Sequence, residues 1–235
     1  MDRFGPQWVG HVAQVEAAWC HLVAPEDVVC LPGDLSWAMR PGEIEEELQW
    51  LGELPGRKVL IKGNHDYWWA SAAKVRRMLP EGVFALQNDS LTLDRVSFAG
   101  ARGWVDDSLE FGALLPTTCA EDGGPGAQHG IRGAEEDQRL YRRELARLES
   151  SLKQLDGDAA LRVALLHFPP ASPDLCETPV TRLLERYRVQ VAVFGHLHGP
   201  GWRDFANPYG ECNGVRYFLV SADFAHFRPV LLAEV

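Results

Sequence analysis

The sequence predicts a protein of the α/β class, and two observations lead to that class. Short apolar runs, each long enough for one buried strand, alternate along the chain with segments in which apolar residues recur at helical spacing. Four of these apolar runs lead directly into an Asp, Asn or His. Ligands bind at the carboxyl ends of strands in α/β sheets. We therefore expect a sheet protein with a polar site at one end of its strands.

The first half of the chain is expected to begin with a helix over residues 7–23. Apolar residues at intervals of three and four predict it: Val9, Val12, Val15, Trp19 and Leu22. Pro25 breaks this helix ahead of a strand that ends at Leu31. Pro41 begins a second helix through Leu51, with glutamates early, where the helix dipole favours them. The remaining elements of this half are a strand over 58–61, a helix over 70–79, and short strands near 83–86, 91–93 and 96–99.

The second half is expected to open with a loop insertion at about 105–132. Its later part contains Gly123-Gly124-Pro125-Gly126 and few apolar residues, and a loop of this length is either mobile or functional. The elements predicted after it are a helix over 135–155, a strand over 163–166, a helix over 178–188, and strands over 191–194, 215–220 and 229–235. No internal repeat or domain boundary is evident, so residues 1–235 are expected to form a single domain.

Composition limits the class of partner. The chain has 33 acidic and 23 basic residues and a net charge of −10, so non-specific nucleic-acid binding is not expected. Bound cations could still reverse the local field for a small phosphorylated substrate. The apolar runs are too short to cross a bilayer and the start has no signal peptide, so a cytoplasmic protein is expected. The five scattered cysteines are expected to be reduced thiols, and the oligomeric state is left open.

The polar residues at the four strand ends are candidate metal ligands. They are Asp34, Asn64, His167, His196 and His198. A mixture of carboxylate, amide and imidazole suits Mn, Fe, Zn or Co better than Ca. Two such ions about 3.5–4 Å apart would clamp a phosphoryl group and lower the pKa of a bridging water.

Two neighbours of Asn64 are candidate catalytic groups. His65 could protonate a leaving-group oxygen, and Asp66 could orient His65 and hold it charged. The alternatives are a hydrogen-bonded loop residue for His65 and a helix cap for Asp66.

These motifs resemble those of the calcineurin-like metallophosphoesterase family. The resemblance runs from about Leu31 to Gly199, and its motifs occur in the family's order: Gly33-Asp34, Gly63-Asn64-His65-Asp66, His167 after a strand, and Gly195-His196-Leu197-His198. It implies a four-layer α/β/β/α sandwich with a two-metal site between the sheets.

The resemblance also implies a role for each candidate residue. Asp34 would bridge the two metals, and His198 would serve the first of them. The second metal would be completed by Asn64, His167 and His196. His65 and Asp66 would form the acid/base pair.

The chain departs from the family pattern in two places. The G-D-x-x-D motif ends in Trp37 instead of a second Asp. The family's opening strand, which ends in D-x-H, has no counterpart ahead of Asp34, so the first metal would keep only Asp34 and His198. We expect a fuller natural start that supplies this strand, and a naturally shortened chain is the alternative. Weaker candidates for the vacant positions are Asp2, Asp106, Asp107 and Asp223.

The function predicted on this basis is hydrolysis of phosphate mono- or diesters by a metal-bridging hydroxide. It would require two divalent ions, with manganese the expected metal in vitro. The alternative is a catalytically impaired, truncated protein of the same fold that binds a metal or another ligand. Retention of His65 and Asp66 favours the enzyme, and the missing D-x-H favours the alternative. Trp37, Trp68 and Trp69 are expected in the core or a pocket wall, with a platform for a substrate ring as the alternative.

Overall fold

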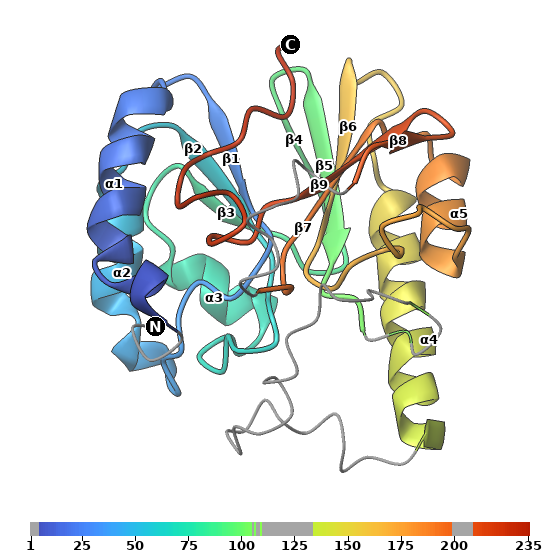
Figure 1. Cartoon of the computed structure of the whole chain (residues 1–235), viewed down its shortest axis with the longest axis horizontal. Helices are drawn as coiled ribbons and strands as arrows, with labels where there is room; N and C mark the ends of the chain where they lie inside the picture. The colour runs from blue at the N-terminus through green and yellow to red at the C-terminus, as the bar shows by residue number, and fades with distance from the viewer. Residues whose placement is uncertain (1–4, 105, 107–108, 110–133, 199–208) are drawn as a thin grey trace.

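The computed structural model describes residues 5–104, 106, 109, 134–198 and 209–235, and it contains two β-sheets flanked by helices (Figure 1). The helices are α1 (His11–Leu22), α2 (Glu45–Glu53), α3 (Ala72–Met78), α4 (Ala134–Leu152) and α5 (Pro179–Arg186). The strands are β1 (Val28–Leu31), β2 (Arg57–Leu60), β3 (Val83–Ala85), β4 (Ser90–Leu93), β5 (Val96–Ala101), β6 (Leu161–Leu166), β7 (Val191–Phe194), β8 (Glu211–Cys212) and β9 (Val215–Leu219).

The two sheets differ in size and in strand direction. The first has the order β1-β2-β3, and both of its pairs are parallel. The second has the order β4-β5-β6-β7-β9-β8. Its four central strands are parallel, and β4 and β8 pair antiparallel at its edges. The loops that follow β1, β2, β6 and β7 carry the predicted ligands.

Alternation along the strands creates four layers. In β2 and just after it, Val59 and Ile61 pack against the second sheet, whereas Leu60 packs against the helices outside the first sheet. In β6, Leu165 faces the first sheet and Leu166 faces the outer helices. Buried residues of α1, α2 and α3 cover the first sheet, and those of α4 and α5 cover the second (Figure 1). The predicted α/β sandwich is confirmed.

The boundaries differ from the sequence prediction at both ends of the chain. The first helix begins at His11, because a 3-10 turn over Pro6–Trp8 and a left-handed Gly10 (φ 68°) precede it. The strand predicted over 229–235 is wrong, since these residues form no ladder. Pro229 has no N–H group to donate to a sheet. The edge of β9 that faces away from β7 already pairs with β8, a strand that the sequence did not predict. The predicted insertion at 105–132 lies almost entirely outside the described residues.

Two further expectations concern residue chemistry and the membrane. Four of the cysteines lie in described parts of the chain, and all four are free thiols: Cys20, Cys30, Cys176 and Cys212. Within the described residues, no helix combines the length and the apolar character that crossing a bilayer requires.

Candidate metal centre

Four of the five predicted ligands converge between the two sheets. Asn64 Oδ1 lies 2.5 Å from His167 Nε2 and 3.0 Å from His196 Nδ1. His167 Nε2 is also 3.2 Å from His196 Nδ1 and 3.4 Å from Asp34 Oδ2. Two of these side chains come from the first sheet and two from the second, so the packing of the sheets assembles the group.

The backbone at this point is tightly constrained. Asp34 and His196 both occupy the left-handed region, with φ of 59° and 69°. Such conformations are uncommon outside glycine and concentrate at functional sites. The Asp34 and Gly63 loops also touch directly, because a Cβ on Gly63 would lie 2.0 Å from Asp34 Oδ1. The close approach of these two loops requires glycine at this position.

The protonation of His167 shows why this group suits a cation. Its Nδ1 lies 2.9 Å from the carbonyl oxygen of Pro32, which can only accept, so Nδ1 carries the proton. Burial is the main influence on this imidazole, and it lowers the pKa of His167 in favour of the neutral ring. The Nε2 lone pair then points at the oxygens of Asn64 and Asp34, which are themselves electron-pair donors. A divalent cation would convert this repulsion into coordination, and the Pro32 contact is the type of support that ligating histidines usually have.

The charged and imidazole side chains do not form a metal site by themselves. Considering only His, Cys, Asp and Glu, the described part of the chain holds no group of three or more side chains arranged to bind a metal ion. The convergence depends on the Asn64 amide oxygen, which contacts both imidazoles.

Asp66 has different partners from the one that the sequence suggests. Its Oδ2 accepts hydrogen bonds from the backbone N–H groups of Gly63 (2.7 Å) and Asp34 (2.8 Å). Its Oδ1 accepts from Trp68 Nε1 (2.9 Å) and from the Ser36 N–H (3.3 Å). Burial, and then the negative charge of Asp34, raises the pKa of Asp66, while these hydrogen bonds oppose the increase. The carboxylate, 1% exposed, ties the two ligand-bearing loops of the first sheet together.

His65 is held by aromatic neighbours. Its imidazole stacks on Trp37, with ring centroids 4.8 Å apart and planes 11° apart. Its Nδ1 lies 3.3 Å from the hydroxyl of Tyr67. Burial, followed by the charge of Asp34, raises the pKa of Tyr67, so this hydroxyl keeps its proton and can donate it in a hydrogen bond. Trp37 is 40% exposed, whereas Trp68 and Trp69 are buried in the core as expected.

His198, the fifth predicted ligand, has separate contacts. Its Nδ1 lies 2.8 Å from Oδ1 of Asp223, whose side chain is 7% exposed. The buried Trp8 meets the same imidazole edge-on, with centroids 5.6 Å apart. Asp223 was only a weak ligand candidate, and its pairing with His198 has no local sequence signal because it depends on where the chain after β9 packs.

Two basic residues lie beside the centre, and no motif marked them. Arg102 follows β5, and its carbonyl oxygen accepts hydrogen bonds from the N–H groups of His167 and Phe168 (3.1 Å each). Lys62 precedes the Gly63-Asn64-His65-Asp66 run and donates from Nζ to the Trp69 carbonyl (3.0 Å). Burial is the main cause that lowers the pKa of Lys62, and the positive charge of Arg102 lowers it further.

The fold and the converging side chains place this chain among α/β sandwich proteins with a candidate metal centre between the sheets. Residues 8–200 match the family model of the calcineurin-like phosphoesterases, and the chain belongs to this family.

Two phage proteins resemble part of the chain. "Gene 66 protein" of Mycobacterium phage L5 is 43% identical over 56 residues, which are 24% of this chain and 27% of that protein. "Gene 66 protein" of Mycobacterium phage D29 is 42% identical over 65 residues, which are 28% of this chain and 31% of that protein. The chain thus spans about three-tenths of the length of these relatives.

Proposed function

We propose that this protein is a metal-dependent phosphohydrolase that cleaves phosphate mono- or diesters. The observation that carries the proposal is the crowding of electron-pair donors around His167 Nε2, where Asn64 and Asp34 direct oxygens at an unprotonated nitrogen. Membership of the calcineurin-like phosphoesterases supports metal-dependent hydrolysis in general terms.

We assign the candidate ligands to two ions. One ion would be held by Asp34, Asn64, His167 and His196, and a second by Asp34 with His198. Nitrogen and oxygen donors of this kind suit Mn, Fe, Zn or Co. When bound, such ions polarise phosphoryl oxygens and lower the pKa of water.

Other residues of the chain would position the ligand-bearing loops and protonate the leaving group. In the imidazolium form of His65, the Nδ1–H group can donate to the Tyr67 hydroxyl oxygen, 3.3 Å away. We assign to His65 Nε2 the transfer of a proton to the leaving-group oxygen, which leaves a neutral imidazole. Trp37 fixes the ring plane by stacking. Asp66 acts on the loop backbone, where it keeps Asp34 and Asn64 in place.

One observation favours the alternative, a protein of the same fold that binds a metal or ligand without catalysis. His198 Nδ1 is engaged by Asp223, whereas the other four side chains contact one another, so a second ion would have fewer firm ligands than the first.

The test is Mn²⁺-dependent hydrolysis of bis(p-nitrophenyl) phosphate and p-nitrophenyl phosphate. We expect activity in the wild type and a loss of at least about 100-fold in Asn64→Ala and His196→Ala, because each removes a direct metal ligand. His21→Ala, on the exposed face of α1, is the matched control and should retain activity. A folded wild type that binds Mn²⁺ and hydrolyses neither ester would support the binding protein instead.

A further inference from the structure

A buried carboxylate next to the candidate centre gathers three arginines. The Glu144 side chain on α4 is 3% exposed. Its Oε1 lies 2.6 Å from Arg147, 3.4 Å from Arg143 and 3.7 Å from Arg102. These described ion pairs bring three positive charges to one negative charge, in a chain whose net charge is −10. Within these described ion pairs, the arginines outnumber the carboxylate that they surround.

Arg102 connects this group around Glu144 to the candidate metal centre. Arg102 follows β5 and is hydrogen-bonded through its carbonyl to the N–H of His167. Its guanidinium lies 4.7 Å from the ring centroid of Trp104, which packs on Phe168 at 5.8 Å. Phe168 in turn packs on His196 at 4.2 Å. An aromatic wall thus leads from a candidate metal ligand to the arginine.

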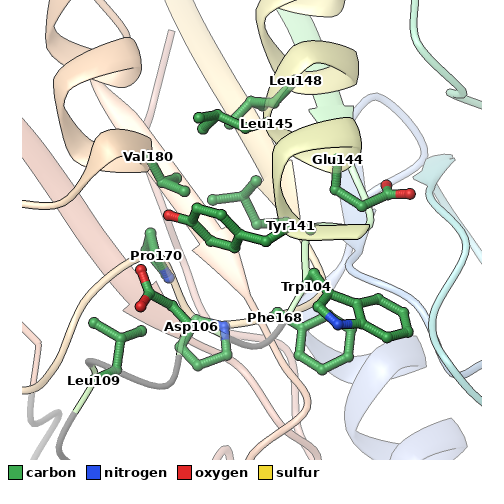
Figure 2. A pocket seen from close by; sticks show the side chains of 13 residues that line it. Trp104, Asp106, Leu109, Tyr141, Glu144, Leu145, Leu148, Phe168, Pro170 and Val180 are labelled. Carbon is green, nitrogen blue, oxygen red and sulfur yellow. The ribbon is translucent and has the colours of Figure 1, made fainter. Parts of the chain in front are cut away.

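The small cavity nearby is not where a ligand would bind. It has a volume of about 20 Å³, which is room for about one water molecule. Figure 2 shows Tyr141 pointing into this cavity, whereas the Glu144 carboxylate leaves α4 on the opposite side, above Trp104. The arginine side chains on that side remain accessible, with exposed fractions of 20% for Arg102 and 39% for Arg147.

We propose that Arg102, with Arg147, forms an anion subsite for a second phosphate group of the substrate. The substrates would then be phosphate esters that carry two phosphate groups. Guanidinium groups bind phosphate through paired hydrogen bonds, and Glu144 and Trp104 would hold these groups in position. The inference rests on the proposed function for the position of the scissile phosphate.

The test compares two nucleotides that differ by one phosphate. Isothermal titration calorimetry in Mn²⁺ would measure the binding of thymidine 3′,5′-bisphosphate and of thymidine 5′-monophosphate. We expect the bisphosphate to bind about 10- to 100-fold more tightly, the range of one hydrogen bond to a charged group. Arg102→Gln should reduce this preference to about twofold or less.

The control is Arg139→Gln on α4, the helix that carries Glu144. The Arg139 side chain is 79% exposed and lies 4.0 Å from Glu136. This variant should keep the wild-type preference. If Arg102→Gln does not fold, Arg102→Lys retains the charge without the planar donor pair and should show an intermediate preference.

The outcomes separate the two proposals. Equal affinities in the wild type, or an unchanged preference in a folded Arg102 variant, would overturn the subsite and indicate that the cluster only joins α4 to β5. A preference for the bisphosphate without hydrolysis of either p-nitrophenyl ester would leave the subsite standing and reject the phosphohydrolase.

Discussion

At the scale of single residues, the centre depends on which nitrogen of each histidine is available. His167 donates a hydrogen bond from Nδ1–H to the carbonyl oxygen of Pro32 and presents Nε2 to Asn64 and Asp34. His198 uses Nδ1 for Asp223 and has Nε2 left for a ligand role. In both cases a neighbour that contacts no metal determines which nitrogen can bind one.

On the proposed assignment, Asp223 should control the binding of a second metal ion at His198. Asp223→Asn removes the charge that holds His198, and we expect about 10- to 100-fold weaker binding of a second equivalent of Mn²⁺, with the first little changed. Calorimetric titration with Mn²⁺ measures both steps. The matched control is Asp158→Asn, because Asp158 is exposed and precedes β6, whereas His198 follows the parallel strand β7 at the other end of the sheet. If wild type and Asp223→Asn bind the second equivalent of Mn²⁺ with the same affinity, Asp223 only fills space.

At the scale of elements, the site depends on two loops that touch. The loops after β1 and β2 approach so closely that Gly33 (φ 95°) and Gly63 lie back to back, with a Cβ on Gly33 only 2.6 Å from the Gly63 Cα. Asp66 then joins them through the backbone N–H groups of Gly63 and Asp34. The position of Asp34 beside His167 follows from this contact.

Gly63→Ala tests the loop contact. The new methyl would lie 2.0 Å from Asp34 Oδ1 and 2.4 Å from Asp34 N, so one loop must move. We expect the free energy of unfolding to fall by about 2 kcal/mol or more, as in other overpacked sites. Urea unfolding measures this change. A Cβ on Gly157 would meet nothing within 4 Å, so Gly157→Ala should change stability by less than about 0.5 kcal/mol. Equal effects of the two substitutions would contradict the loop contact.

Local signals explain what the sequence could predict. Apolar runs and helical spacing located the helices and most strands, because these patterns reflect each element's own burial. The order of the motifs identified the four side chains that the structure brings together: Asp34, Asn64, His167 and His196.

Tertiary contacts explain what the sequence could not predict. Three sets of contacts join residues whose proximity is created by folding: the bonds of Asp66 to Asp34 and Ser36, the stacking of Trp37 on His65, and the pairing of His198 with Asp223. The strand wrongly predicted at 229–235 fails for a similar reason, since local composition does not show that β8 already occupies the sheet edge.

At the scale of the whole molecule, the two sheets share one apolar layer. Val59 and Ile61 from the first sheet pack in one cluster with Phe98, Leu165 and Val193 from the second. Neither sheet can separate without exposing this layer to water. The candidate metal centre joins loops from both sheets, so its assembly depends on the packing of both.

The shared layer predicts cooperative unfolding. Urea transitions followed by tryptophan fluorescence and by far-ultraviolet circular dichroism should coincide, because Trp68 and Trp69 report on the first sheet whereas most strands belong to the second. Two separated transitions would show that the sheets are stable independently.

The most direct test of the central claim is anomalous X-ray diffraction from a crystal of the protein with Mn²⁺. We predict an anomalous peak bounded by Asn64 Oδ1, His167 Nε2, His196 Nδ1 and Asp34 Oδ2. A well-ordered site without such a peak at millimolar Mn²⁺, or a peak only at other side chains, would contradict the assignment of this group as the metal centre.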